Sequence, residues 1–179
     1  MCRKTWGYLE EVNKMRSEIK LLPIDAKSQS IFKNLMTLYL HDLSEFADDL
    51  KINFEGLFEY DGIEYYFKSE DLKPFFIYVN ADIAGFVLLN SGRYVPENID
   101  YSVHELFLMK AYRKKGIASI VVEKLFQLYK GNYKVVQLYH NTPAINFWRN
   151  FYKKSSINYE EFEEVIDGQK GIFQIFSVI

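Results

Sequence analysis

The most chemically informative stretch of the sequence is 105–119, in which an apolar strand pattern runs into a basic turn and then into a helix pattern. The turn carries one glycine, Gly116, and Ala118 follows two residues later. The first N–H groups of a helix have no acceptor within the helix, and the helix dipole adds partial positive charge there. Glycine also lets the backbone approach a bulky anion closely. These features predict a polyphosphate site, to which the turn brings four cations: Lys110, Arg113, Lys114 and Lys115.

The spacing of this turn excludes two common phosphate-binding motifs. The Walker A pattern needs two glycines and a Lys-Ser/Thr pair, and the dinucleotide fingerprint needs three glycines within about six residues. Neither occurs here. What is present is Arg113-x-x-Gly116-x-Ala118. Taken alone, this pattern is equally compatible with a solvated basic turn that ends in a capping glycine.

A second pattern follows after one predicted helix and one predicted strand. The strand, 135–139, ends shortly before Asn141, and Pro143 stands where a helix would take its first residue. The helix that begins there carries three residues on one face: Ala144, Phe147 and Trp148.

Together the two patterns resemble the R/Q-x-x-G-x-G/A and N-x-x-A-x-x-F/Y-Y motifs of the GNAT superfamily of acetyl-CoA-dependent N-acyltransferases. The segments 34–46, 56–60, 83–88, 105–108 and 147–149 are also similar to a GNAT subgroup of predicted acetyltransferases that has no settled substrate. The resemblance implies an α/β (α+β) fold, in which a central mixed, mostly antiparallel sheet of about seven strands is flanked by about four helices.

The resemblance also implies that acetyl-CoA is the cosubstrate and that no metal takes part. In this family a backbone N–H near the end of the fourth strand holds the thioester carbonyl, a position that Leu108 matches. The asparagine of the second motif and the helix after it line the pantetheine arm. Cofactor-binding residues implied in this way are Leu108, Lys110, Arg113, Lys114, Lys115, Gly116, Ala118, Ser119, Asn141, Ala144, Phe147 and Trp148.

Acetyl transfer to an amine needs a group that removes the amine's proton, and His104 and Glu105 on the predicted fourth strand are the two candidates. On a regular strand they face opposite sides, so only one would point into the cleft. Histidine titrates near neutrality, whereas carboxylates on this strand commonly relay the proton through water in the resembling family. We favour Glu105, although a β-bulge, frequent on this strand in the family, would invalidate the parity argument. The alternative for either residue is a structural hydrogen bond.

The general acid is where the chain departs from the family pattern. Many members carry a tyrosine seven residues after the asparagine, a position that Trp148 occupies here. An indole N–H donates a hydrogen bond but is not a practical proton source. Tyr152, one helical turn later, is the candidate substitute, and packing within an amphipathic helix is its alternative role. Since thiol pKa values lie near about 8.5, a thiolate leaves tolerably well without an acid.

Composition and charge exclude several other classes. The formal net charge of −2 leaves no basic excess for a nucleic-acid backbone. A single cysteine, Cys2, excludes intrachain disulfides and cysteine-based zinc sites and suits a reducing compartment. The sequence has no apolar run of roughly 18 residues and no signal-peptide core. We therefore expect a cytoplasmic protein with neither a membrane nor a nucleic-acid partner. Aromatic residues, at 17 %, predict a dense core and an aromatic-lined cleft.

Hydrophobic periodicity predicts one mixed α/β domain over residues 1–179. A short second helix is expected at 42–49 and irregular structure at 50–74. Helix capping explains Asp42 and Ser44 better than a fragment of a catalytic triad does. The other predicted strands are 18–24, 75–79, 83–89, 101–109, 135–139, 159–165 and 172–178, the last two joined by a turn at Asp167-Gly168. The other predicted helices are 27–40, capped by Asp25, a helix after the basic turn with an apolar stripe over 121–129, and 143–153.

The sequence thus predicts an N-acetyltransferase that moves an acetyl group from acetyl-CoA directly to a primary amine of a small molecule, without an acyl-enzyme. A non-catalytic acyl-CoA-binding or sensing domain and a protein N-acetyltransferase are the alternatives. The acceptor is expected opposite the coenzyme, bordered by the second helix, residues 50–74 and the closing hairpin. Polyamine, aminoglycoside, amino acid and peptide N-terminus remain open as acceptors, and a homodimer is allowed. The acidic run 160–164 favours either a cationic amine or only a solvated edge strand.

Overall fold

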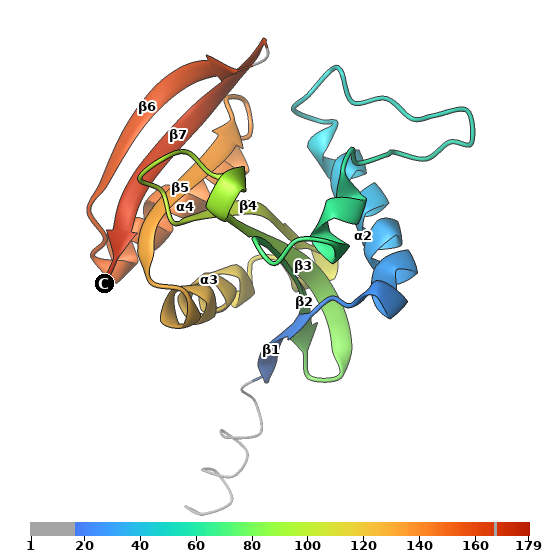
Figure 1. The fold of residues 1–179 in the computed structure, drawn as a ribbon, viewed down its shortest axis with the longest axis horizontal. Helices are drawn as coiled ribbons and strands as arrows, with labels where there is room; N and C mark the ends of the chain where they lie inside the picture. Colours follow the sequence, from blue (N-terminus) through green and yellow to red (C-terminus); the bar gives the residue numbers. More distant parts are fainter. Residues whose placement is uncertain (1–16, 167) are drawn as a thin grey trace, which may run out of the picture.

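The structure is a computed structural model that describes residues 17–166 and 168–179. Its frame is one seven-stranded sheet with the strand order β1-β2-β3-β4-β5-β7-β6 (Figure 1). Neighbouring strands are antiparallel except β4 and β5, which are parallel. The expected mixed, mostly antiparallel sheet is therefore confirmed. The strands are β1 (Ile19–Pro23), β2 (Leu72–Val79), β3 (Asp82–Ser91), β4 (Tyr101–Leu108), β5 (Gly131–Leu138), β6 (Tyr159–Ile166) and β7 (Gln169–Val178).

Three α-helices in the described ranges cover the sheet: α2 (Gln29–Leu43), α3 (Ile117–Leu128) and α4 (Thr142–Ser155). The buried side chains of α2 form one core with β2, β3 and β4, and those of α3 and α4 form a second core on the opposite side. We call these sides the α2 face and the α3/α4 face. None of the helices in the described ranges is long and apolar enough to cross a membrane.

The helical region near the N-terminus differs from the sequence prediction in one respect. Asp25 accepts a hydrogen bond from the Ser28 N–H at 3.0 Å, as a helix cap would, at the start of the short 3-10 helix η1 (Ala26–Ser28) that leads into α2. The second helix predicted at 42–49 is wrong, because α2 continues to Leu43 before the chain turns. Ser44 closes α2 by donating from its hydroxyl to the His41 carbonyl oxygen at 2.7 Å.

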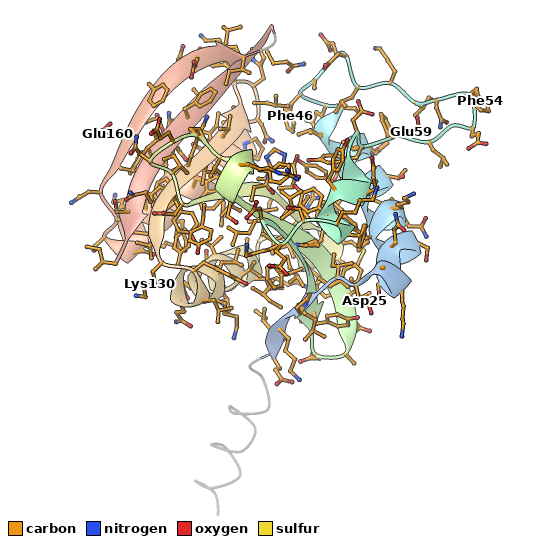
Figure 2. All side chains as sticks on the ribbon, in the orientation of Figure 1. Asp25, Phe46, Phe54, Glu59, Lys130 and Glu160 are labelled. Carbon is orange, nitrogen blue, oxygen red and sulfur yellow. The ribbon has the colours of Figure 1, made fainter. Side chains whose placement is uncertain are left out.

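The 44–71 segment between α2 and β2 is irregular, as expected, apart from the 3-10 helix η2 (Ile63–Phe67). Its outer part extends away from the body of the protein, and Figure 2 shows Phe54 at its tip. Its inner part returns to the sheet. Tyr66 is buried there, and its hydroxyl donates to Oδ1 of Asn90 at 2.9 Å. This return brings Tyr60 and Tyr66 against the core of the α2 face.

β4 and β5 pair only where they begin. Tyr101 pairs with Tyr133 and Ser102 with Lys134, and within these two fully described strands no further pair joins them. β5 is instead paired with β7 along its whole length. Because β7 holds β5 in place while β3 holds β4, the two strands separate and leave an opening in the middle of the sheet.

β4 also contains a β-bulge. Leu88 pairs with Glu105 and Leu89 pairs with Val103, so His104 is the extra residue on β4. Val103 packs in the core of the α3/α4 face, whereas Glu105 turns toward α2. The extra residue breaks the alternation of side chains, and His104 and Glu105 therefore both lie on the α2 face.

Aromatic side chains fill both cores, as the composition predicted. On the α3/α4 face the Tyr133 and Phe176 rings stack with their centroids 5.4 Å apart. On the α2 face Phe32 meets Phe86 edge to face at 5.3 Å. Full burial of one such side chain stabilises the fold by roughly 1.5–3 kcal/mol, so these cores hold the helices firmly on the two faces of the sheet. The β6–β7 hairpin closes the chain as predicted, although its turn residue Asp167 and the lone Cys2 lie outside the described residues.

We predict that Gly85→Ala will destabilise the fold by roughly 2–4 kcal/mol, measured as the free energy of unfolding in urea. A Cβ at Gly85 would lie 1.9 Å from the carbonyl oxygen of Phe107, so β3 and β4 would have to move apart beside the opening. Gly56→Ala is the matched control, because Gly56 has φ +78° but nothing within 4 Å of its Cβ position. It should cost only about 1–2 kcal/mol of left-handed backbone strain. Equal losses in the two variants would contradict the close approach of β3 and β4.

Candidate active site

Glu105 is the acidic side chain that the β4 bulge presents to the α2 face, and two tyrosines hold it. Tyr39 of α2 donates a short hydrogen bond from its hydroxyl to Oε2 of Glu105. Tyr60 of the 44–71 segment donates to Oε1 at 3.5 Å. Two elements that are far from β4 in the sequence therefore converge on one carboxylate.

This environment changes the acid–base properties of all three groups. Burial raises the pKa of the Glu105 carboxyl, while nearby His104 and the hydrogen bonds from Tyr39 and Tyr60 act in the opposite direction without cancelling it. Burial, followed by the charge of Glu105, raises the pKa values of Tyr39 and Tyr60 far above the ordinary tyrosine value. The tyrosines therefore stay protonated as donors, and Glu105, whose pKa is raised, is the member of the cluster that can take up a proton.

His104 is exposed and lies beside Glu105 on the same face, so both predicted candidates for the base point toward one side of the opening. His104 lines a cavity of about 330 Å³ between β4, β5, β7 and the loop after β3. Glu105 does not line that cavity but stands behind Tyr39 and Tyr60. The expectation that only one of the two could face the acceptor side is wrong, because the bulge removes the alternation on which it relied.

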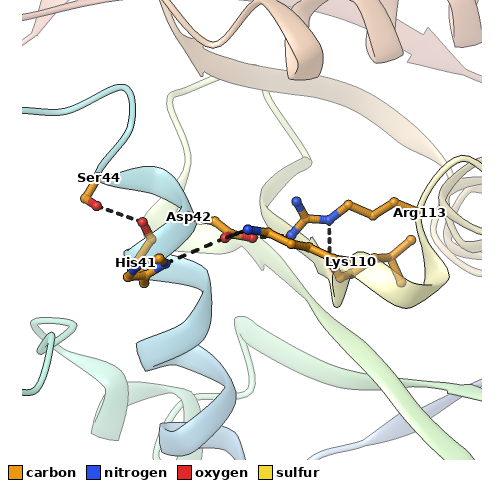
Figure 3. Close-up of polar contacts among 6 residues, drawn as sticks. His41, Asp42, Ser44, Lys110 and Arg113 are labelled. Carbon is orange, nitrogen blue, oxygen red and sulfur yellow. Dashed lines mark hydrogen bonds and ion pairs between the residues drawn. The ribbon is translucent and has the colours of Figure 1, made fainter.

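A second carboxylate, Asp42 near the end of α2, is surrounded by cations (Figure 3). The Arg113 guanidinium forms a short ion pair with Oδ2 of Asp42, and Nζ of Lys110 lies 3.5 Å from Oδ1. His41 adds a ring nitrogen, Nδ1, at 3.8 Å from Oδ1. Burial alone would raise the pKa of Asp42, but the hydrogen bond and charge of Arg113, helped by Lys110, hold it below the usual range. Asp42 is thus a fixed negative charge, and the prediction that it caps a helix is wrong.

Arg113 does more than pair with Asp42. Its Nε donates to the carbonyl oxygen of Leu108 at 2.6 Å, and its guanidinium carbon lies 5.7 Å from the centre of the Phe107 ring. The carbonyl of Leu108 belongs to the last residue of β4, on the edge that β5 has left. Arg113 therefore connects α2 to the end of β4. It does not extend toward Gly116, in the turn that the sequence predicts to bind phosphate and that we call the phosphate turn.

The turn itself is built as the sequence predicted. Gly116 has φ +77°, caps α3 at its N-terminus, and has nothing within 4 Å of its Cβ position. Lys114 also has a positive φ, of 59°, and Lys114 and Lys115 are exposed. Ala118 and Ser119 are partly buried in the first turn of α3, and Ala118 packs against the core. The space over Gly116 and the free N–H groups of the first helical turn suit a bulky anion.

A cleft of about 280 Å³ lies between the end of β4 and the N-terminus of α4. Asn141 lies at one edge of it, where its side-chain oxygen accepts a hydrogen bond from the Ala144 N–H at 3.1 Å and so caps α4. Five of the residues predicted to bind the coenzyme line this cleft: Leu108, Lys110, Arg113, Asn141 and Ala144. Side chains of α2 and the residues after it, among them Tyr39, Asp42 and Phe46, line its other side.

Other predicted residues lie away from the cleft. Trp148 is only 5 % exposed and stacks on Tyr152 with the ring centroids 5.8 Å apart. Tyr152 is fully buried, and its hydroxyl donates to Oε1 of Gln174 at 3.1 Å. Phe147 is partly buried against the same core. Tyr152 therefore has the packing role that was the alternative for it, and its hydroxyl is already used inside the core.

Sequence reasoning missed Tyr39, Tyr60 and Asp42. In the sequence Tyr39 has only the spacing of an apolar helix stripe, and Tyr60 lies among other aromatic residues of the irregular segment. No spacing rule connects either of them to Glu105, which is 66 residues from Tyr39 and 45 from Tyr60. The one available signal was the density of tyrosines in 58–67, which exceeds what a surface loop needs.

In the part of the chain that the structure describes, no group of three or more His, Cys, Asp or Glu residues could hold a metal ion.

Comparison with solved structures shows the same fold in proteins of very different sequence. The aminoglycoside acetyltransferase AAC(6')-Ib, solved with coenzyme A, is 12 % identical with a TM-score of 0.63, over 89 % of this chain and 95 % of that one. The diaminobutyrate acetyltransferase EctA from Paenibacillus lautus, solved with L-2,4-diaminobutyric acid and coenzyme A, is 13 % identical with a TM-score of 0.58, over 91 % and 96 %. Arabidopsis thaliana NAA60, solved with a bisubstrate analogue, is 15 % identical with a TM-score of 0.55, over 90 % and 100 %.

No curated protein sequence matches the chain. A sequence model of the acetyltransferase (GNAT) family does match it, over residues 36–151. This range is more than half of the chain, and it runs from α2 through the bulged strand, the phosphate turn and α4. The chain therefore belongs to the acetyltransferase (GNAT) family.

Proposed function

We propose that this protein transfers an acetyl group from acetyl-CoA directly to a primary amine of a small molecule. The observation that carries the proposal is the position of Glu105: a carboxylate of raised pKa on the bulge of β4, near the place where β4 and β5 separate. A base on one side of a split sheet and an anion site on the other are what a two-substrate transfer requires.

Acetyl-CoA fits the residues that surround the opening. The left-handed Gly116 leaves room for a pyrophosphate at the start of α3, where Lys114 and Lys115 are exposed. The cleft lined by Leu108, Asn141 and Ala144 would take the pantetheine arm. When bound, acetyl-CoA supplies the acetyl group as a thioester, whose carbon–sulfur bond is exchanged for a carbon–nitrogen bond to the amine.

Glu105 then accepts the proton that the amine nitrogen loses. Tyr39 and Tyr60 keep the carboxylate oriented and shield it from bulk water. Because burial raises its pKa, Glu105 is a stronger base than an exposed glutamate and is better matched to the removal of a proton near neutral pH. His104, exposed on the same face, is the competing candidate.

The structure offers no acid from α4, since Trp148 and Tyr152 are both in the core. Coenzyme A can leave as a thiolate, because thiol pKa values are about 8.5. A non-catalytic acyl-CoA-binding domain is the alternative function, and it would leave the Glu105–Tyr39–Tyr60 cluster as a structural element only.

We predict that Gly116→Glu will abolish acetyl-CoA binding, measured by isothermal calorimetry. The substitution places a side chain and a negative charge where the pyrophosphate would lie, in backbone that is already left-handed. Gly168→Glu is the matched control, because Gly168 has φ +81° and equally open surroundings in the β6–β7 turn. Unchanged affinity in Gly116→Glu would mean that the turn is only a basic loop.

We predict that Glu105→Gln will lower kcat by roughly 100-fold while acetyl-CoA affinity stays the same, because the amide cannot take a proton. The measurement is thiol release with a panel of amines, together with calorimetry of acetyl-CoA. His104→Gln should affect kcat much less. If His104→Gln instead removes the low-pH limb of the rate profile and Glu105→Gln does not, His104 is the base.

We predict that Tyr39→Phe will move the acidic limb of the kcat/KM profile to higher pH. The Tyr39 hydroxyl stabilises the charged form of Glu105 and so lowers its pKa; removing the hydroxyl raises that pKa further. Tyr65→Phe, at a half-exposed position in η2, should leave the limb in place. A limb that stays fixed or moves to lower pH in Tyr39→Phe would exclude Glu105 as the group that titrates.

A further inference from the structure

The cavity beside His104 lies on the α2 face, over the place where β4 and β5 separate. Ser102 and His104 form its β4 side, and Lys134, Val136 and Leu138 form its β5 side. The loop after β3, residues 92–100, crosses in front of β5 in Figure 1. Tyr94, Val95 and Pro96 of this loop line the cavity. The sequence predicts an acceptor site bordered by the second helix, residues 50–74 and the closing hairpin, without this loop.

The charged groups that line this cavity are positive. Lys134 and Lys170 line it together with His104, and no aspartate or glutamate does. Lys170 is already paired with Glu163, at 2.5 Å between Nζ and Oε2. Lys134 has no carboxylate within ion-pair distance among the described residues; its Nζ lies 4.8 Å from the centre of the Phe173 ring. A partly buried ammonium with only an aromatic face beside it leaves donors free for an anion.

The acidic run on β6 does not supply a carboxylate partner for Lys134. Glu161 accepts hydrogen bonds from Arg149 and Gln174, and Glu163 pairs with Lys170. Glu160 and Glu164 share the face of the sheet with Phe173 but belong to the outer edge strand and do not line the cavity. The prediction that this run selects a cationic amine has no support in the geometry of the cavity.

Apart from the polar side chains of Ser102, Gln137 and Gln169, the rest of the lining is mostly apolar and aromatic. Phe173 forms part of the floor, Val136 stands beside it, and Tyr94 and Pro96 come from the loop above. At about 330 Å³ the cavity is at the small end of the range for ligand sites. The ligand of this cavity should therefore be a small molecule with one apolar group and one negative charge.

We infer that this cavity binds the acceptor and that the acceptor is an amino acid with an apolar side chain, its carboxylate held by Lys134. The inference rests on the proposed function, because a molecule seated there lies next to His104, the competing candidate for the base and the neighbour of Glu105 on β4. Among the acceptors that the sequence left open, polyamines and aminoglycosides are disfavoured, because their extra positive charges would meet Lys134 and Lys170. Specificity here comes from repulsion of cationic amines as well as from attraction of the carboxylate.

The test compares N-acetyl-L-phenylalanine with its neutral isostere N-acetyl-L-phenylalaninamide. Each is titrated by calorimetry into the protein saturated with coenzyme A. Neither probe has a titrating amine, so the comparison isolates the carboxylate. We expect the acid to bind about tenfold more tightly than the amide at low salt, a difference typical of a charge-assisted hydrogen bond.

Lys134→Met should abolish that preference while keeping the apolar contact with Phe173. Lys124→Met is the matched control: Lys124 is also partly buried and lines a different cavity, next to β1. Equal binding of acid and amide to the unmodified protein, or a preference that survives Lys134→Met, would overturn the inference.

A parallel assay of thiol release from acetyl-CoA separates this inference from the proposed function. The expected result is faster release with L-phenylalanine than with spermidine or kanamycin. Efficient release with spermidine or kanamycin would overturn the inference while supporting acetyl transfer. A Lys134-dependent preference for the acid, with no release from any amine, would support the carboxylate site and overturn acetyl transfer as the function.

Discussion

The separation of β4 from β5 is the constraint on which the rest of the structure depends. Two residue pairs join the strands, and beyond them the edge of β4 that faces β5 has lost its sheet partner. Backbone groups in such a position need other partners, and a buried one left without any is costly. The carbonyl of Leu108 obtains its partner from Arg113. The opening persists because each strand is fixed on its other side, β4 by β3 and β5 by β7.

Two carboxylates stand near this opening, and their environments move their pKa values in opposite directions. Glu105 is surrounded by neutral tyrosine donors and apolar side chains, so burial dominates and raises its pKa. Asp42 is surrounded by Arg113 and Lys110, so its charged form is favoured and its pKa falls. One group is therefore suited to accept a proton, while the other is a permanent negative charge that positions Arg113 and, through it, the end of β4. A division of this kind between neighbouring carboxyl groups is a general way to assign acid–base and structural roles.

Much of the fold was predictable because it depends on local patterns. The β2–β3 and β6–β7 hairpins follow from alternating apolar residues around short turns, and α3 and α4 follow from their apolar stripes and capping residues. The turn at Gly116 was predictable for the same reason, since the need for a left-handed residue before a helix is encoded within a few positions. The error at 42–49 was also local: Asp42 looked like the start of a helix, when its charge is instead satisfied by cations about 70 residues away.

The sequence by itself determined the family, the order of the elements and the turn at Gly116, because each depends on residues that are close together in the chain. Only the tertiary structure decided which face His104 and Glu105 share, since one inserted residue in β4 reverses the alternation and leaves no mark in the residue types. Only the tertiary structure brought Tyr39 and Tyr60 to Glu105, buried the Tyr152 hydroxyl against Gln174, and left Lys134 without a carboxylate partner among the described residues. The physical reason is the same in each case. The free energy of a charge or a hydroxyl depends on what surrounds it, and those surroundings come from strands and helices that are distant in sequence.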